Sequence, residues 1–579
     1  MNKRVKQQHS ETVPKLHWTY VLPVCLAATF VVEVISGTYL WLHYSPSAYT
    51  AWESVWHIEN QISGGQFCRN LHHFSTDLTI FLIGAWLLQL AVLSWKTAPR
   101  KVPLWVSLAC VVLLLALART GEVLPWDQKA YSGAHVVANI VGSIPILGEN
   151  LKLVIMGGAE PGHFTLTRFT VLHCFLLPLL LLTATSLLFL VKSKTTVTQS
   201  IRRQLPAITI TTAGTVLCLG MYSLMNDTSL GSPADQTGTS PIARPAWYFL
   251  PLFELLRHVP VAIGAYLIPT ATLILLGMLP WIGKNKLGRA FGSIFAIGVL
   301  GSACWLGLSA YAKDMQDIRY QSAKVMEKKR VERLNELICR NGIPPAGAAE
   351  MAERDPLLRG PRLFAEHCSG CHNHAYIPAG LTTAKTSAPD LTQFANREWV
   401  SAILDLELFQ SAAFFGNTKF KDGKMARKVL PKISDAPHED LQAIVAALSA
   451  EAALPYQREI DRRDEKLIQH GKNLLTAEYG CTDCHQYYDI TDIDEATALD
   501  LTGYGTSEWL QAFISNPKSA RFYGNKNDSM PTFHQGSLTT EEIELLSAWL
   551  RREWSGASGF SSNADATKTF SQTSMIHMP

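Results

Sequence analysis

Seven long apolar runs in the first 312 residues constrain this chain more than any other feature. They lie at residues 18–42, 71–95, 104–125, 168–192, 205–225, 261–282 and 290–312. An α-helix rises about 1.5 Å per residue, so about 20 apolar residues are needed to cross the hydrocarbon core of a bilayer. The runs therefore predict seven membrane-spanning helices. Residues 313–579 are polar and charged throughout, so a mean hydrophobic content of 47% averages two unlike halves.

The charges between these runs predict the direction in which the helices cross. Lysine and arginine gather before the first run and in every second loop afterwards, as at Lys96, Arg100 and Lys101, while the other loops carry acidic residues such as Glu53 and Glu59. Because positively charged loops stay in the cytoplasm, the N-terminus is expected there. The first run is too long for the apolar core of a signal peptide and should remain as a span. Seven crossings then deliver the polar half to the periplasm of a bacterial cytoplasmic membrane, or to an equivalent outer compartment.

Two Cys-x-x-Cys-His motifs lie in the polar half. They are Cys368-Ser-Gly-Cys371-His372 and Cys481-Thr-Asp-Cys484-His485. This spacing allows two thiols to bond the vinyl groups of one haem while the histidine ligates its iron. One motif alone is also compatible with chance or with half of a zinc site. Two copies, in two similar segments on the side of the membrane where c-type haem is attached, favour two covalent haems c.

A single methionine follows each motif, Met425 in the first segment and Met530 in the second. A thioether is a suitable sixth ligand for haem iron and raises its potential. Both methionines lie in polar sequence with the character of a loop, which fits a ligand better than a residue of the core. We therefore predict His372 with Met425, and His485 with Met530, as the axial ligands of the two haems c.

Basic residues surround the first methionine. They are Lys419, Lys421, Lys424, Arg427, Lys428 and Lys432. The second segment is acidic, with 10 Lys and Arg against 17 Asp and Glu over residues 456–555, a balance of −7. Opposite charge on two haem segments would orient them toward each other or toward different partners. The alternative is an ordinary solvated surface, and no basic tract of the kind that binds nucleic acid is present.

Three histidines lie inside predicted membrane helices. His72 and His73 open the second run and His173 lies early in the fourth, and both runs start on the outer side. At about 1.5 Å per residue, His72 and His173 lie at matching depth, roughly 8–10 Å below the surface. An ionisable residue in a membrane helix is a functional hypothesis by default. A facing pair at one depth is what a bis-histidine haem b requires, although either histidine alone would suit a satisfied core.

Five motifs in the membrane half occur in an order that is shared with one family. They are Arg69-Asn-Leu-His72-His-Phe-Ser, Leu124-Pro-Trp-Asp-Gln, Ile144-Pro-Ile-Leu-Gly, Thr165-Leu-Thr-Arg-Phe-Thr-Val-Leu-His173 and Pro245-Ala-Trp247-Tyr248-Phe-Leu-Pro. They resemble cytochrome b of the bc-type (Rieske/cytochrome b) complexes, most closely the chloroplast-type split form. The resemblance covers residues 15 to about 312. It implies an all-α fold, a seven-transmembrane-helix cytochrome b bundle with four haem-binding helices plus three, here followed by two mainly α-helical cytochrome c domains.

The expected domain organisation follows from the runs, the motifs and this resemblance. It consists of a cytochrome b N-terminal four-helix haem domain at 1–200, a C-terminal three-helix domain at 201–312, a helical linker at 313–355, cytochrome c domains at 356–455 and 456–555, and a disordered tail at 556–579. Within the linker, residues 313–340 read as one charged helix. The tail is expected to be disordered because it is rich in Ser, Thr, Ala and Asn.

The resemblance also implies roles for single residues. His72 and His173 match the outer-side haem ligands of the family, and Arg69 matches a partner of a haem propionate. Gly37 and Gly121 match the glycines that let the haem approach two helices, which fits the lack of a side chain. The family is usually dimeric and partnered with a Rieske iron–sulfur protein.

The chain departs from the family at the inner haem. The family has a second histidine about 14 residues after each of the first two. Here position 86 is Trp86, and the window at 186–188 contains no histidine. Pro23 and Ser107 stand in place of the inner-side glycines. One non-covalent haem b is therefore expected, not two.

The outer quinol pocket departs as well. The family motif Pro-Glu-Trp-Tyr supplies a carboxylate that takes a proton from quinol, and here that residue is Ala246, before Trp247 and Tyr248. Alanine cannot act as a base. Arg119 stands where the family has an apolar residue of the pocket, and an unpaired charge there would be costly. The expected partners of Arg119 are Asp77, Glu33 and Glu254, and Glu254 is also a substitute proton acceptor.

Two kinds of function remain. The first is a membrane-bound electron-transfer subunit of a quinol–cytochrome c oxidoreductase, with a degenerate quinol site, working with a Rieske protein, a second and complete cytochrome b, and a soluble periplasmic cytochrome c. In that case this chain itself does not oxidise quinol, and no catalytic residue is assigned. The second is a non-enzymatic, membrane-anchored relay that carries three haems.

Overall fold

The computed structural model describes residues 18–94, 101–191, 194–235, 243–377, 387–490, 496–524, 529–533 and 536–556. The chain divides into two compact units, Met1–Ala349 and Glu350–Pro579. The described residues of both units are helical or irregular, and the only β-type pairing among them is an isolated bridge between Asp127 and Pro233. This confirms the all-α prediction for the described part of the chain.

Six helical segments of the first unit are long and apolar enough to cross a membrane. They are α1 (Trp18–His43), α3 (Gly65–Ser94), α4 (Lys101–Gly121), the run of α7 (His163–Val171), η1 (Leu172–Leu176) and α8 (Leu177–Val191), then α9 (Lys194–Met225) and α13 (Lys286–Gln316). They correspond to six of the seven predicted spans.

The predicted span at 261–282 is broken into shorter pieces. It consists of η3 (Ala262–Leu267), which has π-helical hydrogen bonding, then α11 (Ile268–Gly277) and α12 (Leu279–Ile282). Pro280 occupies the first turn of α12, where its missing N–H matters least. Together these pieces are as long as the predicted run, but none of them reaches spanning length alone. The seven-pass count therefore stays a prediction.

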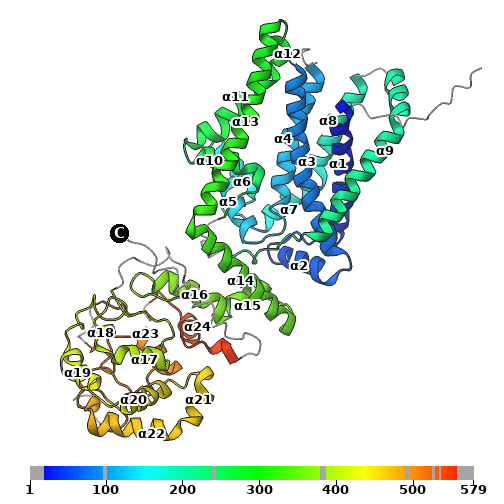
Figure 1. Ribbon diagram of the computed structural model, residues 1–579. Helices are drawn as coiled ribbons and strands as arrows, with labels where there is room; N and C mark the ends of the chain where they lie inside the picture. Colours follow the sequence, from blue (N-terminus) through cyan, green and yellow to red (C-terminus); the bar gives the residue numbers. More distant parts are fainter. Residues whose placement is uncertain are drawn as a thin grey trace, which may run out of the picture. The chain divides into compact units, whose positions relative to one another are not determined.

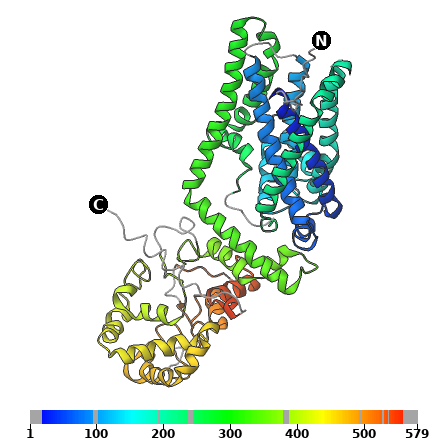
Figure 2. The same cartoon turned by 45° about the vertical axis from the view of Figure 1, so that its right-hand side comes forward.

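The long helices of the first unit pack side by side. Helix α1 packs on α3 and α9, and α4 packs on α8, as the parallel ribbons of Figure 1 and the rotated view of Figure 2 show. Helix α13 packs on α3 and on the short α10 (Leu250–Leu256), which follows the 3-10 turn η2 (Trp247–Phe249). This arrangement brings residues of the C-terminal part of the unit against α3.

Short helices close the end of the bundle at which the predicted ligands lie. They are α2 (Ala51–Gln61), α5 (Gln128–Gly142) and α6 (Gly148–Met156). Trp126 is 2% exposed and packs with Tyr131 and Met156 in the core beneath them. Asp127 caps α5 by accepting a hydrogen bond from the backbone N–H of Ala130, and also accepts from that of Gly231. The Leu-Pro-Trp-Asp-Gln motif therefore builds this cap and core.

The charged linker is helical, with one interruption. Helix α13 continues to Gln316, and α14 (Ile318–Asn341) begins after Asp317, whose carboxylate accepts from the backbone N–H of Tyr320. Helix α14 ends at Gly342, which has a φ of 71°. The prediction of a single helix over 313–340 is wrong at residue 317, because Asp317 caps a new helix there.

The second unit contains both Cys-x-x-Cys-His segments. Its helices are α15 (Ala348–Glu353), which begins in the first unit, then α16 (Pro356–His367), α17 (Arg397–Leu404), α18 (Leu406–Phe409), α19 (Leu430–Ser434), α20 (His438–Glu451), α21 (Arg458–Arg463), α22 (Glu465–Asn473), α23 (Ser507–Ser515) and α24 (Thr540–Leu550). Single-turn pieces lie between them, among them η4 (Met425–Val429) and η7 (Cys481–Asp483).

The helices at the ends of the two segments pack across the segments. Helix α16, at the start of the first segment, packs on α24, at the end of the second, while α20 packs on α22. Both crossings use a glycine: a Cβ on Gly360 would collide with Trp549, and one on Gly471 would collide with the carbonyl oxygen of Ala443. We call this arrangement the helix exchange.

One hydrophobic core therefore serves both segments. It includes Phe364 and Leu430 from the first segment, and Trp509 and Trp549 from the second. The sequence led us to expect two separate domains at 356–455 and 456–555, whereas the structure has one unit. The boundaries of the two haem-bearing segments within that unit stay predictions.

Candidate functional site

His72 and His173 face each other inside the helix bundle. Their ring centroids are 6.1 Å apart and their planes are nearly perpendicular, at 81°. His72 belongs to α3, and His173 to the π-helical turn η1, a local widening of the helix that often marks functional positions. With metal–nitrogen bonds of about 2 Å on both sides, two imidazoles that share one metal have ring centres roughly 6 Å apart. The pair therefore fits two axial ligands of one iron.

Gly37 and Gly121 lie against these two rings. A Cβ on Gly37 would stand 3.0 Å from Cε1 of His72, and a Cβ on Gly121 would stand 2.7 Å from Cε1 of His173. Neither position has room for a larger residue unless the ring moves. The structure thus brings the four residues together, and their roles in binding a haem stay predictions.

Arg69 lies one turn before His72 and is already engaged. Its Nη1 pairs with the carboxylate of Glu59 and donates to the carbonyl oxygen and the hydroxyl of Thr228, at 3.0 and 2.9 Å. The side chain of Arg69 is 15% exposed. Its assignment as a propionate partner stays a prediction.

Two residues at which the chain departs from the family's inner haem site contact each other. The indole Nε1 of Trp86 donates to the hydroxyl of Ser107 at 3.2 Å, and that hydroxyl donates to the carbonyl oxygen of Pro103 at 2.8 Å. Beside them, Cys110 and Leu181 are buried in an apolar cluster. Trp86 and Ser107 stand where the resemblance would place a histidine and a glycine, and the absence of an inner haem stays a prediction.

The residues of the predicted quinol site meet two carboxylates. Trp247 donates from Nε1 to Asp77 at 2.8 Å, and Tyr248 donates from its hydroxyl to Oε1 of Glu122 at 2.9 Å. The other oxygen of Glu122 accepts from Nη1 of Arg119 at 2.7 Å. Glu122 thus bridges Arg119 and Tyr248, and no carboxylate stands at position 246.

The partner of Arg119 is therefore Glu122, and the three expected partners were wrong. Glu122 is one helical turn away, whereas Asp77, Glu33 and Glu254 are committed elsewhere. The Nε and Nη2 atoms of Arg119 are buried without a hydrogen-bond partner among the described residues. Its guanidinium packs over Gly133, where a Cβ would collide with it.

Glu254 is not a free proton acceptor either. It is 1% exposed and pairs with Lys313, with Arg257 at 3.2 Å and with His258 at 3.1 Å. Lys313, Arg257 and a histidine ring hold this carboxylate, so it is a poor substitute for the base missing at position 246.

The two Cys-x-x-Cys-His motifs have the same local geometry. In each, the backbone N–H of the histidine donates to the carbonyl oxygen of the first cysteine, at 2.9 Å for His372 and 3.0 Å for His485. The Nδ1 of His372 lies 2.7 Å from the carbonyl oxygen of Pro389, and the Nδ1 of His485 lies 2.7 Å from that of Leu499. A carbonyl at Nδ1 fixes the ring and leaves Nε2 to ligate a metal.

Burial shifts the pKa values of corresponding residues in the two motifs alike. It lowers the pKa of His372 and of His485, which favours the neutral imidazole that a metal requires. It raises the pKa of Cys368 to about 12 and that of Cys481 to about 11. The first cysteine of each motif therefore faces the interior of the unit.

The same hydrogen bonds recur after each motif. Trp399 donates from Nε1 to the carbonyl oxygen of Asp390 at 2.8 Å, and Trp509 donates to that of Asp500 at 2.9 Å. The carboxylate of each aspartate also accepts a hydrogen bond, at 2.7 Å, from the backbone N–H of the threonine that follows two residues later in the sequence. The two segments are therefore structural repeats over this stretch.

Met425 and Met530 are half-buried and pack against the shared core. Met425 begins the helical turn η4, so it is not in a loop as expected, whereas Met530 lies in irregular structure. Within the described residues, no three His, Cys, Asp or Glu side chains converge on one point. The assignment of the methionines as sixth ligands stays a prediction.

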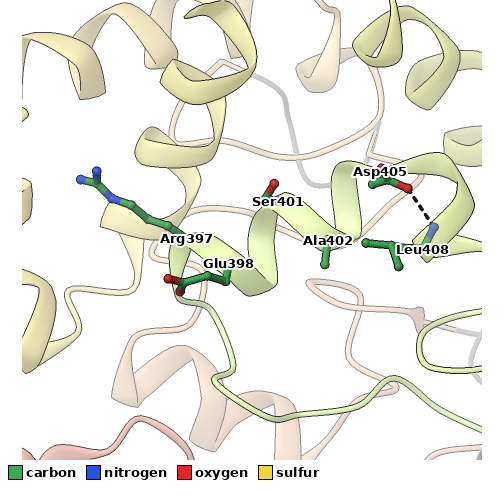
Figure 3. Close-up of a pocket in the computed structure, with 6 residues that line it drawn as sticks. All are labelled: Arg397, Glu398, Ser401, Ala402, Asp405 and Leu408. Carbon is green, nitrogen blue, oxygen red and sulfur yellow. Dashed lines mark hydrogen bonds between the residues drawn. The ribbon is translucent and has the colours of Figure 1, made fainter. Parts of the chain in front are cut away.

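A cavity of about 430 Å³ lies along one face of α17 in the second unit. Figure 3 shows Arg397, Ser401 and Asp405 on its wall, with Asp405 accepting a hydrogen bond from the backbone N–H of Leu408 at 2.9 Å. None of the predicted haem ligands lines it. It is therefore separate from the candidate sites.

Some residues of the site were not found from the sequence. Ser36 and Thr120 each precede one of the two glycines and lie 3.0 and 3.2 Å from Nδ1 of His72 and His173. A hydroxyl residue directly before each glycine was a visible signal. Glu122 could have been found as the carboxylate nearest to Arg119 in sequence.

Two family models match the membrane half of the chain. The model described as cytochrome b/b6/petB matches residues 7–196, and the model described as cytochrome b(C-terminal)/b6/petD matches residues 233–308. The first contains the histidine pair and both glycines, and the second contains Trp247 and Tyr248. Both matched ranges end before the Cys-x-x-Cys-His segments.

Similar proteins agree with these matches. Cytochrome b of Rickettsia bellii is 27% identical over 302 residues, which is 49% of this chain and 75% of that protein. Cytochrome b of Rickettsia prowazekii is 27% identical over 297 residues, 48% of this chain and 74% of that protein. A solved structure titled hyperthermophilic respiratory Complex III is 20% identical with a TM-score of 0.37, covering 52% of this chain and 93% of that one.

With six helices of spanning character, this chain is an integral membrane protein, and its membrane half carries the N-terminal and C-terminal domains of the cytochrome b/b6 family.

Proposed function

We propose that this chain is a membrane-bound electron-transfer subunit of a bc-type quinol–cytochrome c oxidoreductase, with one haem b and two haems c. The observation that carries the proposal is the facing pair of His72 and His173, 6.1 Å apart between ring centres, each ring seated on a glycine. Haem iron supplies one-electron transfer when it is bound. The cytochrome b family of the membrane half supports haem b and a bc-complex context.

The residues of the chain would hold the three haems in two ways. His72 and His173 hold haem b without a covalent bond, with Gly37 and Gly121 making room and Arg69 near the propionates. The covalent haems are attached through Cys368 and Cys371, and through Cys481 and Cys484. Their axial ligands are His372 with Met425, and His485 with Met530.

The quinol site of this chain is degenerate in this proposal. Ala246 offers no base, and Glu122, the nearest carboxylate to Tyr248, is already paired with Arg119. Trp86 and Ser107, which are hydrogen-bonded to each other, replace an inner-side histidine and glycine of the family, and this supports the loss of the inner haem. Quinol chemistry would then belong to a second, complete cytochrome b in a dimeric complex that also contains a Rieske iron–sulfur protein.

A second candidate function is a membrane-anchored relay with no enzymatic role. The bridge from Arg119 through Glu122 to Tyr248 favours it, because a pocket that holds an ion pair offers little space for a quinol ring. In either case electrons leave through the haems c to a soluble periplasmic cytochrome c, with the N-terminus of the chain in the cytoplasm and seven crossings.

A haem assay of the purified chain tests the proposal. The pyridine haemochrome spectrum should give one haem b to two haems c per polypeptide. A ratio of one to one would mean a second haem b and would contradict the prediction that this chain has no inner haem. The variants Cys371→Ala and Cys484→Ala should each remove one haem c and leave haem b in place.

A further inference from the structure

The two histidines of the haem b pair sit in equivalent seats on α1 and α4. Each seat is a hydroxyl residue followed by glycine, Ser36-Gly37 under His72 and Thr120-Gly121 under His173. Each hydroxyl donates to a carbonyl one turn earlier, at 2.7 Å for Ser36 and 2.9 Å for Thr120. Its oxygen is therefore left to accept a hydrogen bond from the Nδ1–H of the histidine.

The seats differ in the second acceptor. The Nδ1 of His173 lies 3.0 Å from the backbone carbonyl oxygen of Leu117, three residues before Thr120. The equivalent position in the other seat, three residues before Ser36, is Glu33. The carboxylate oxygen Oε2 of Glu33 lies 3.0 Å from the Nδ1 of His72. One ligand thus faces a neutral carbonyl and the other faces a carboxylate.

The Glu33 carboxylate is fixed in place by α3. Its other oxygen accepts from the hydroxyls of Ser75, at 2.5 Å, and Thr76, at 2.8 Å, which follow His72 by three and four residues. The side chain is 17% exposed and lies in a helix of spanning character. A carboxylate at such a position is costly, so its contact with a ligand points to a function.

We propose that Glu33 is a positioning residue for His72 and lowers the redox potential of haem b. The inference rests on the proposed function, because it requires His72 to ligate haem iron. A carboxylate that accepts the Nδ1–H holds the ring orientation and makes Nε2 a stronger electron donor. A stronger donor, and a negative charge nearby, stabilise the oxidised iron relative to the reduced iron.

An equilibrium redox titration of haem b in the full chain tests this. Glu33→Gln keeps an acceptor for the Nδ1–H but removes the charge. It should shift the equilibrium toward the reduced haem at least tenfold, which is about 59 mV for one electron. Glu53→Gln is the matched control, because Glu53 is a half-buried carboxylate of α2 that accepts from the backbone N–H of Ala348 and does not pair with a histidine. The redox potential of haem b should be unchanged in this control.

In a second variant, the redox potential of haem b should shift in the direction opposite to that in Glu33→Gln. Thr76→Val removes one hydroxyl that donates to Glu33, so more of the negative charge is available to His72, and the potential should fall. This variant decides the matter if Glu33→Gln fails to bind haem. A fall supports the inference, and no change or a rise overturns it.

The outcomes separate this inference from the proposed function. If the unmodified chain carries no haem b, the proposed function fails. If haem b is present but its potential is the same in Glu33→Gln, only the inference about Glu33 fails. The low-spin electron paramagnetic resonance signal, which reports the angle between the two rings, should shift in Glu33→Ala and stay in place in Glu53→Gln. An unaltered signal in Glu33→Ala would exclude the positioning role.

Discussion

At the scale of single residues, the membrane histidines could be found from the sequence because depth in a helix follows from residue number. The helices that carry His72 and His173 start on the same side of the membrane, and each histidine lies a similar number of residues from that start. No knowledge of packing was needed. The partners of charged residues could not be found in this way. Arg119 was assigned three distant carboxylates, and the structure pairs it with Glu122 in the next turn. Whether a distant carboxylate faces a guanidinium depends on helix rotation, which the sequence does not fix, whereas the spacing of three residues between Arg119 and Glu122 was visible in the sequence.

The glycine seats lead to a prediction at the same scale. Gly121→Ala should lower the haem b content of the purified chain by more than half, because the new Cβ would stand 2.7 Å from the ring of His173 and push it out of line. Overpacking of this kind costs about 1–3 kcal/mol. The reduced-minus-oxidised spectrum per polypeptide measures the effect.

Gly84→Ala is the control for this variant. Gly84 also lies in a membrane helix, α3, but a Cβ there has no heavy atom within 4 Å. Haem b content should be unchanged in this variant. Equal loss in both variants would mean that glycine flexibility, and not the space beside the ring, decides haem binding.

At the scale of elements, apolar runs predicted six of the helices well, since length and hydropathy alone identify a spanning helix. The run at 261–282 was also apolar, yet it is divided at Met278, before Pro280. The helix exchange between α16, α20, α22 and α24 was not predictable. Repeats carry similar helices, so the pairing within a segment and the pairing across segments bury the same faces, and only the three-dimensional structure distinguishes them.

The helix exchange predicts that the two c-type segments unfold together. Trp549→Ala should destabilise the second unit by about 3–5 kcal/mol, the usual cost of removing a buried tryptophan. Trp549 is 1% exposed, and its ring lies 4.4 Å from that of His374, two residues after the predicted ligand His372. The variant should therefore disturb the spectrum of the first haem c as well, although Trp549 belongs to the second segment.

Thermal unfolding followed at both haems c checks this prediction. One shared transition, moved to lower temperature in Trp549→Ala, is expected for a single core. Trp554→Ala is the control, because Trp554 is only half-buried at the edge of the same core. Two separate transitions, with the first haem unaffected by the change at Trp549, would mean that the segments fold independently.

A docking prediction belongs to the turn that begins at Met425. All six basic residues around it are exposed in the structure, as a docking face requires. The double variant Lys421→Glu and Lys424→Glu should slow electron transfer with an acidic partner cytochrome and flatten its dependence on ionic strength. Lys466→Glu, in the acidic second segment, should have little effect. A rate that never depended on ionic strength would exclude electrostatic docking at this turn.

At the scale of the whole chain, the proposed function gives the polar half covalent haem sites and gives the membrane half one haem b in place of two. Trp86 fills the inner position and Ala246 removes the base, while two attachment motifs follow on the same chain. Both changes act in one direction. In the proposed function they would remove the route of the second electron across the membrane and keep the route to the outside.

The proposed loss of the base and of the inner haem predicts that the quinol site of this chain contributes nothing to turnover. In the purified complex, Tyr248→Phe should leave the rate of quinol oxidation unchanged within about twofold, because a hydroxyl that only donates to Glu122 takes no part in the reaction. The same substitution at the corresponding tyrosine of a complete cytochrome b partner is the positive control and should slow the rate.

A tenfold loss in Tyr248→Phe, about 1.4 kcal/mol in the barrier, would show that this site works. So would a quinone or a site inhibitor found beside Ala246 and Trp247. Either result would place quinol oxidation on this chain. Glu122, although it is paired with Arg119, would then be the carboxylate nearest to Tyr248.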